Sequence, residues 1–217
     1  MKWGVALISV FAVVYCVVLL HMNSDDPFEF NYAGFMRSCA STGVLPSFLL
    51  FLQAGSIRCK AFDRVRRDPR WELLANTLWM MAANLVAAFV GTFLFAFMEC
   101  VLMRQTMTPA HVSLLVMMFV QLMMMNGSVA LIILFLVNCG LSFGQVTPVA
   151  IAFYTVGNWL LTSLRGDAER IIFYFWYPIS PLWSIVFVKQ VVPFIGYCVL
   201  MAMVIVIAFE RTDRLDA

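Results

Sequence analysis

The chain has 217 residues, of which 63% are apolar and only 12% are charged, and its mean hydropathy is +0.92. A water-soluble fold could not bury that much apolar surface, so the composition excludes ordinary soluble domains. The formal net charge of +2 is too small to indicate binding to nucleic acid.

The apolar residues form long blocks with almost no charge, and each block could cross about 30 Å of hydrocarbon as a helix. No segment alternates apolar and polar residues as the strands of a membrane barrel do. We therefore predict an all-α, polytopic integral membrane protein with a single transmembrane domain over residues 1–217. Six spans are expected, at residues 3–20, 38–57, 73–98, 112–137, 146–164 and 191–209.

A further apolar block, residues 171–188, is separated from the last span only by Lys189 and Gln190. Two residues are too few to reverse the chain between two full spans. Pro178 and Pro181 would break a helix in this block, because proline lacks the amide hydrogen. We predict a re-entrant helical hairpin at 171–188, with a seventh span as the alternative.

The basic residues are distributed unequally between the two sides of this topology. With the amino terminus inside, nine of the fourteen lie on the inner side and five on the outer side. The positive-inside rule therefore predicts that both termini lie in the cytosol. We expect a multi-pass protein of the cytoplasmic (inner) membrane.

Catalytic and cofactor motifs are weak or missing. Gly140 to Gly144 reads GLSFG, a G-x-S-x-G match, but no histidine follows Ser142, so we interpret it as a turn that glycine permits. The sequence has no phosphate-binding loop and no Rossmann glycine pattern, and thus no nucleotide site of its own. We expect no enzyme activity and no cofactor on this chain.

The cysteines and histidines do not form a metal-binding pattern either. No two cysteines have a C-x-x-C spacing, which disfavours a zinc or redox site. Buried thiols are expected, and a disulfide between Cys39 and Cys100 is the alternative. His111 with Glu99 is an alternative surface metal pair, although an ordinary interfacial role is favoured.

The polar side chains near the middle of the predicted spans are uncharged amides and hydroxyls, and they are Asn84, Gln121, Asn126, Ser128 and Asn158. Amides in hydrocarbon usually bond to a neighbouring helix, so we favour interhelical hydrogen bonds over contact with a translocated substrate. Ala83, Ala87 and Gly91 recur every fourth residue and predict a close approach of another helix.

The segment 58–72, RCKAFDRVRRDPRWE, carries six of the fourteen basic residues. It has two interpretations. It is either a loop held in the cytosol beside anionic lipid, or, because acids and bases alternate along it, a short helix that docks onto a soluble partner.

The order of parts resembles the membrane subunits of ABC transporters of the type-2 exporter class, which includes exporters of bacteriocin-like peptides and self-immunity systems. The resemblance rests on AGSIRCKAFDRVRRDPRWELLANTLW after the second span, YPISPLW before the last span and FERTD at its end. Members commonly begin with an amphipathic helix on the inner face, whereas this chain has only Met1 and Lys2 before its first apolar block.

The resemblance implies an exporter of an amphiphilic or peptide-like substrate, in which two permease subunits, identical or paired with a sibling, lie in the bilayer. ATP and magnesium would bind a separate ATPase subunit. The coupling helix that contacts this ATPase would contain Arg58, Lys60, Asp63, Arg64, Arg66, Arg67, Asp68 and Arg70. The alternatives are a channel or carrier outside the ABC class and a membrane scaffold or assembly subunit.

Overall fold

The computed structural model describes residues 27–56, 70–163 and 174–211, and every regular element in them is helical. Three runs of helix contain a π-helical stretch (η), in which the chain is wound more loosely than in an α-helix. The elements are α2 (Phe28–Gly34), η1 (Phe35–Val44), α3 (Leu45–Gly55), α5 (Arg70–Phe97), η2 (Met98–Leu102), α6 (Pro109–Asn138), α7 (Phe143–Ser163), α9 (Trp183–Val186), η3 (Phe187–Val191) and α10 (Val192–Arg211).

Four helical runs are long and apolar enough to cross a membrane: Phe28–Gly55, Trp71–Val101, Pro109–Asn138 and Trp183–Glu210. The chain is therefore an all-helical, multi-pass membrane protein. The four runs contain nearly all of the predicted spans 38–57, 73–98, 112–137 and 191–209. Helix α7 lies at the predicted span 146–164 but is not apolar enough to belong to this group. The predicted span 3–20 lies outside the described residues.

The first described run begins ten residues earlier than predicted, at Phe28 rather than Ser38. Phe28, Tyr32 and Phe35 recur at helical spacing and are all buried, so this stretch has an apolar face although acidic residues precede it. Ser38 marks no helix start, because it lies inside η1, where its carbonyl accepts a hydrogen bond of 2.6 Å from the Thr42 hydroxyl.

The predicted hairpin at 171–188 also needs correction within its described part. Residues 174–182 are non-helical and contain Pro178 and Pro181, but residues 183–188 belong to the same helical run as the last span. Lys189 and Gln190 lie inside η3 and do not separate two helices. The indole Nε1 of Trp183 donates to the Ser113 hydroxyl at 2.8 Å, which attaches the start of this run to α6.

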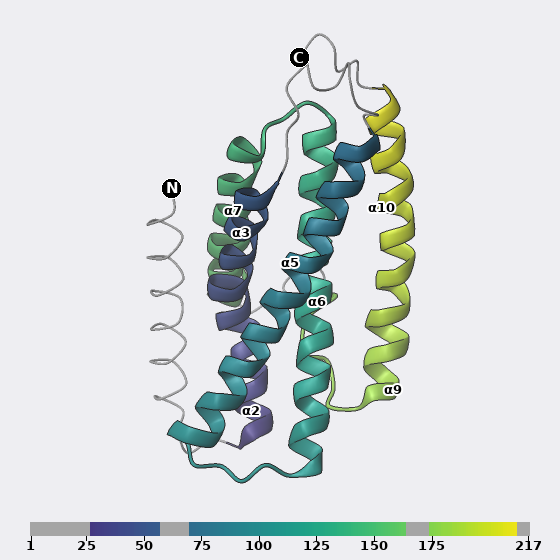
Figure 1. Cartoon of the computed structure of the whole chain (residues 1–217). Helices are drawn as coiled ribbons and strands as arrows, with labels where there is room; N and C mark the ends of the chain where they lie inside the picture. Colours follow the sequence, from purple (N-terminus) through teal and green to yellow (C-terminus); the bar gives the residue numbers. More distant parts are fainter. Residues whose placement is uncertain (1–26, 57–69, 164–173, 212–217) are drawn as a thin grey trace.

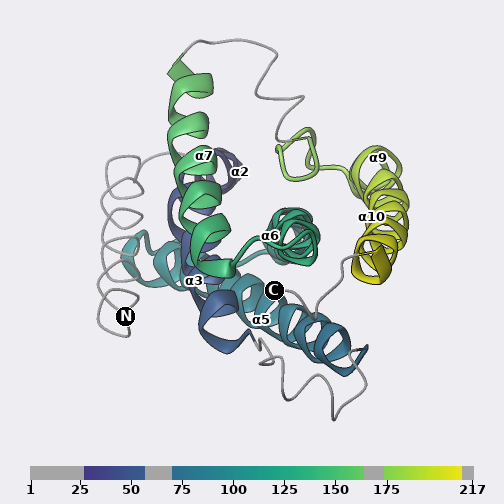
Figure 2. The same cartoon turned by 90° about the horizontal axis from the view of Figure 1, so that it is seen from above.

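Helix α6 occupies the centre of the molecule, with α5, α7 and α10 around it (Figures 1 and 2). Two tight connections identify the two ends of the bundle. Gly140, with φ +105°, lies in the α6–α7 turn, and Arg104, with φ +54°, lies in the η2–α6 connection. We call these the Gly140 end and the Arg104 end. Helices α3 and α10 finish at the Gly140 end, where α5 begins, whereas α2 and α9 begin at the Arg104 end (Figure 1).

The small residues of α5 allow close packing, as their spacing predicts. Ala83 and Gly91 are buried, and α5 packs against α6. A Cβ atom added at Gly91 would lie 3.1 Å from Leu122 Cδ1 of α6 and 3.1 Å from Val44 Cγ2. Only glycine therefore leaves the three helical runs at this spacing without a shift of their side chains.

Gly55, the last residue of α3, provides a test of this packing. An alanine methyl there would lie 2.1 Å from Trp79 Cε2, and the same indole donates to the Leu52 carbonyl at 3.2 Å. We predict that Gly55→Ala lowers the free energy of unfolding by about 1–3 kcal/mol, as overpacking does. Thermal unfolding of the purified protein in detergent would measure it. Gly34→Ala is the control, because that Cβ would meet no atom within 4 Å; equal melting temperatures for the two variants would contradict the packing.

The alternating directions of the helices predict that the two ends lie on opposite sides of the membrane. In a chain whose other cysteines are serine, we expect a membrane-impermeant maleimide to label Thr106→Cys in intact cells, because the positive-inside rule predicts that the Arg104 end lies outside. The native Cys139, near the Gly140 end and exposed, should react only after permeabilisation. Labelling of both positions from one side would contradict the arrangement.

Candidate functional site

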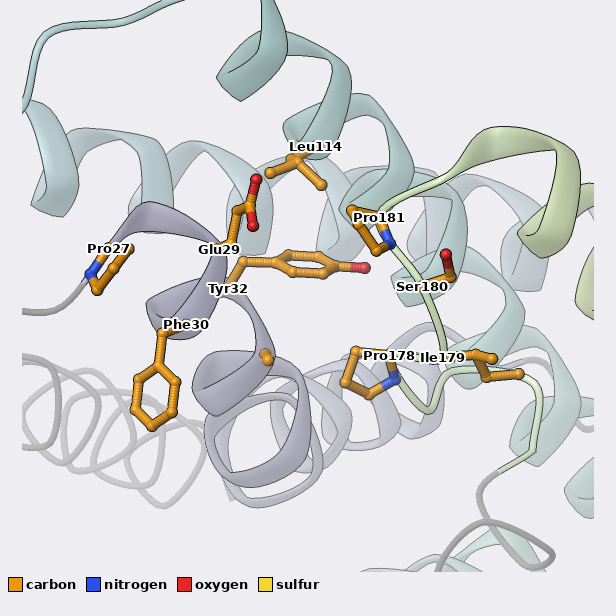
Figure 3. Close-up of a pocket in the computed structure, with 10 residues that line it drawn as sticks. Pro27, Glu29, Phe30, Tyr32, Leu114, Pro178, Ile179, Ser180 and Pro181 are labelled. Carbon is orange, nitrogen blue, oxygen red and sulfur yellow. The ribbon is translucent and has the colours of Figure 1, made fainter.

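A pocket of about 360 Å³ opens between the start of α2, α6 and the non-helical segment 174–182 (Figure 3). It lies at the Arg104 end, where α2 begins. The ring of Tyr32 reaches across it, and the phenol points toward the prolines of the segment (Figure 3). The lining residues are Pro27, Glu29, Phe30, Tyr32, Ala33, Leu114, Pro178, Ile179, Ser180 and Pro181.

The lining is mostly apolar, with few polar groups. Among the described residues that line it, only Glu29 carries a formal charge, and its side chain is exposed. Ser180 contributes a hydroxyl group and Tyr32 an aromatic ring, whose hydroxyl donates to Gln121. Such a surface suits a ligand with an apolar body and one polar or charged group, and its volume is typical of small-molecule sites.

From the pocket, a chain of hydrogen bonds leads into the interior of the bundle. The Tyr32 hydroxyl donates to Gln121 Oε1, and Gln121 Nε2 donates to Gln190 Oε1 at 2.9 Å. Gln190 Nε2 donates in turn to the carbonyls of Tyr174 at 2.7 Å and Tyr177 at 2.8 Å. Gln121 and Gln190 are both 0% exposed. This chain joins α2, α6, η3 and the non-helical segment that forms one wall of the pocket.

Arg37 extends the network toward α7. Its Nη2 donates to the Tyr177 hydroxyl at 2.7 Å, and its guanidinium carbon lies 4.9 Å from the centroid of that ring. Asn158 Nδ2 of α7 donates to the Arg37 carbonyl at 2.8 Å. The two predicted polar residues Gln121 and Asn158 thus belong to one network, although they do not touch.

The remaining predicted polar residues lie elsewhere. Asn84 Nδ2 donates to the Met123 carbonyl at 2.9 Å and so joins α5 to α6. Asn126 is fully buried, and its side chain has no hydrogen bond with a described residue. Sequence reasoning missed Tyr32, Arg37 and Gln190, because all three lay outside the spans as predicted. The sequence contained one indication of the role of Gln190, because it is a polar residue within a long apolar stretch.

The charged segment predicted to couple to an ATPase falls largely outside the described residues. Arg58, Lys60, Asp63, Arg64, Arg66, Arg67 and Asp68 are not described, and Arg70 is the first residue of α5. The chain enters the segment after Ser56 and leaves it at Arg70, both at the Gly140 end (Figure 1). The segment and the pocket are therefore attached to opposite ends of the bundle.

Glu99 of η2 is a buried acid separate from the pocket lining. It is 0% exposed, and the Asn31 side chain is its polar neighbour, yet neither carboxylate oxygen accepts a hydrogen bond of regular geometry from a described residue. From the sequence, His111 is the alternative metal partner of Glu99, and an ordinary interfacial role is favoured. Instead, the His111 ring stacks on Phe28 with centroids 4.3 Å apart, and His111 forms a capping box with Thr108 at the start of α6.

The other motifs have structural roles. Cys39 and Cys100 are not joined to each other by a disulfide, so the alternative pairing does not form. Ser142 in the G-x-S-x-G match donates its hydroxyl to Gln145 Oε1 at 2.8 Å, and Gly140 adopts the positive φ of a turn. The described residues contain no group of three or more His, Cys, Asp and Glu side chains placed to hold a metal ion.

The Gln121–Gln190 pair allows a direct test of the network. Gln190→Leu keeps the approximate shape of the side chain but leaves the Gln121 amide and two backbone carbonyls without their partner. We predict a loss of about 1–3 kcal/mol in unfolding free energy, measured by thermal denaturation in detergent. Val188→Ala, at an exposed position of the same η3 segment, is the control and should change little.

A double mutant makes this test specific to the pair. Gln121→Leu should destabilise the protein as Gln190→Leu does, but the double variant should lose less than the sum of the two, because no unpaired amide remains between them. Additive losses would mean that the two side chains do not interact.

Comparison with known proteins identifies no relative. No protein-family model matches the sequence, and neither the curated proteins nor the solved structures include a match. The assignment of a function therefore rests on the residues and geometry described above.

Proposed function

We propose that the chain is the membrane-spanning permease subunit of an ABC exporter, and that it moves an amphiphilic or peptide-like substrate across the cytoplasmic membrane with the help of a separate ATPase. One observation carries this proposal. The pocket lies at the Arg104 end, whereas the charged segment is attached to the Gly140 end. A transporter driven from one side needs its docking segment and its outward-facing site at opposite ends.

The distribution of charge supports this orientation. The connection between α3 and α5 carries the densest group of basic residues, so the positive-inside rule places the Gly140 end in the cytosol. Acids alternate with those bases, a mixture that favours a protein surface over anionic lipid. An ATPase that docks on residues 58–72 would therefore approach from the cytosol, and the pocket would face outward.

The lipid-facing surface supports a larger assembly. In the most apolar window of Trp183–Glu210 only 6% of residues are buried within the chain. Ile195, Val199, Met203 and Val206 follow one another at helical spacing, and all are exposed. Lipid can cover such a face, and so can a second permease subunit, either identical or a sibling. In this proposal the second subunit packs on α10.

The hydrogen-bond network favours one other function. Gln121 and Gln190 are fully buried, bond to each other and hold neighbouring elements together. Such rigid internal connections also suit a membrane scaffold or assembly subunit, whose task is to hold a fixed shape. The remaining alternative, a channel or carrier outside the ABC class, is supported only by the pocket.

Co-purification with the ATPase tests the proposal. We expect that affinity-tagged protein extracted from its native membrane brings down an ATPase, and that the charge reversals Asp63→Arg, Arg64→Glu, Arg66→Glu and Arg67→Glu together abolish this association. The reversals would place like charges opposite each other where the wild-type segment and the ATPase have opposite charges. Such a pairing of like charges costs several kcal/mol at an interface.

A matched control separates docking from general damage. Arg104→Glu reverses a charge at the opposite end and should leave the association intact. ATPase that still co-purifies with the fourfold variant would refute the coupling role. If the wild-type chain brings down no ATPase, the ABC proposal fails and the scaffold function is favoured.

A further inference from the structure

We propose that the pocket at the Arg104 end binds the cationic head of an amphiphile, with Glu29 as the countercharge. The proposal names the substrate class of the transport site and in that respect rests on the function proposed above. The ligand class is a quaternary ammonium or similar delocalised cation attached to an apolar body.

Charge complementarity is the first argument. Glu29 is the one formal charge among the described lining residues, and it is exposed at the start of α2. In the sequence, Asp25 and Asp26 immediately precede Pro27, the first lining residue, so negative charge is concentrated along this part of the chain. A cation that enters the pocket would replace water around Glu29, and partial desolvation strengthens their attraction.

The nearest basic residue on the same helical run does not neutralise Glu29. Arg37 lies eight residues further along, about 12 Å at the rise of an α-helix. Its guanidinium is already bonded to the Tyr177 hydroxyl at 2.7 Å and does not line the pocket. Among the described lining residues, none carries a positive charge that would pair with Glu29.

The shape of the walls defines the rest of the ligand. Pro178, Ile179 and Pro181 form one side and Leu114 forms another, so a compact apolar body would contact rigid rings and branched side chains. Proline rings are already fixed in φ, which lowers the entropy lost when a ligand packs on them. The volume of about 360 Å³ lies at the small end of the range for ligand sites, which favours a headgroup over a folded peptide.

Tyr32 provides a reason to prefer a delocalised cation. Its hydroxyl is engaged with Gln121, so the ligand meets the aromatic ring rather than a free hydroxyl. Aromatic rings attract quaternary ammonium groups through the electrons of the ring face. A cation with no hydrogen-bond donors needs no acceptor from Tyr32.

Glu29 also has an ordinary structural explanation, since an acid in the first turn of a helix interacts favourably with the helix dipole. The experiment must therefore separate ligand binding from stability. Tetraphenylphosphonium and tetraphenylborate have the same shape and opposite charge, and they serve as probes. Equilibrium dialysis against the purified full-length chain in nanodiscs, with empty nanodiscs subtracted, measures the binding of each.

We expect the wild-type chain to bind tetraphenylphosphonium more tightly than tetraphenylborate. Glu29→Gln should weaken tetraphenylphosphonium binding by roughly threefold to tenfold, the effect of one partly desolvated ion pair. Glu210→Gln, an exposed acid in the last turn of α10 at the opposite end, should have no effect. Equal binding of the two probes, or unchanged binding by Glu29→Gln, would overturn the proposal.

A second variant keeps the test decisive if Glu29→Gln loosens α2. Ile179→Arg adds a positive charge to the opposite wall without touching that helix, and it should exclude tetraphenylphosphonium while it leaves the melting temperature unchanged. Tetraphenylphosphonium binding that persists in a folded Ile179→Arg protein would also refute the site. No ATPase is present in this assay, so a negative result for cation binding would leave the coupling prediction standing. Conversely, a loss of ATPase association would leave cation binding intact.

Discussion

The hydrogen bond between Gln121 and Gln190, 2.9 Å long and fully buried, is the interaction on which the rest of the structure depends. Within a bilayer no water is available to satisfy an amide, so the two side chains must be satisfied by protein. Gln121 accepts from Tyr32 and donates to Gln190, and Gln190 donates to two carbonyls of the non-helical segment. This one pair thereby fixes the position of the last helical run against α6 and holds a wall of the pocket.

The π-helical stretches explain how polar groups enter an apolar bundle. Each of the three contains a polar or charged residue that a regular α-helix would direct differently: Arg37 in η1, Glu99 in η2 and Gln190 in η3. A π-helical turn rotates the following residues relative to the preceding face, and such turns are frequent at functional sites. Arg37 and Gln190 meet the same non-helical segment, at Tyr177, from two different helices.

Hydropathy was sufficient to locate the centres of four helical runs, because a long apolar block without charge has few alternatives to a membrane helix. It failed at their ends. Lys189 and Gln190 look like a break between two blocks, but Gln190 is tolerated inside a helix because its amide bonds to carbonyls thirteen and sixteen residues earlier. The partner of Tyr32 is 89 residues away. Local pattern contains no information about such distant partners, so the pocket and its network could not be predicted.

The hydrogen bonds of Gln190 and the two prolines both help to stabilise the non-helical segment 174–182. Irregular backbone within a membrane protein is stable only where its amides and carbonyls find partners. Pro178 and Pro181 have no amide hydrogen and so remove two donors, while Gln190 satisfies the carbonyls of Tyr174 and Tyr177. The same Gln190 lies in the run that continues to Arg211 at the Gly140 end, about 32 Å away at 1.5 Å per residue. A continuous helical run therefore connects the wall of the pocket to the opposite end of the bundle, and the proposed ATP-driven export would require such a physical connection.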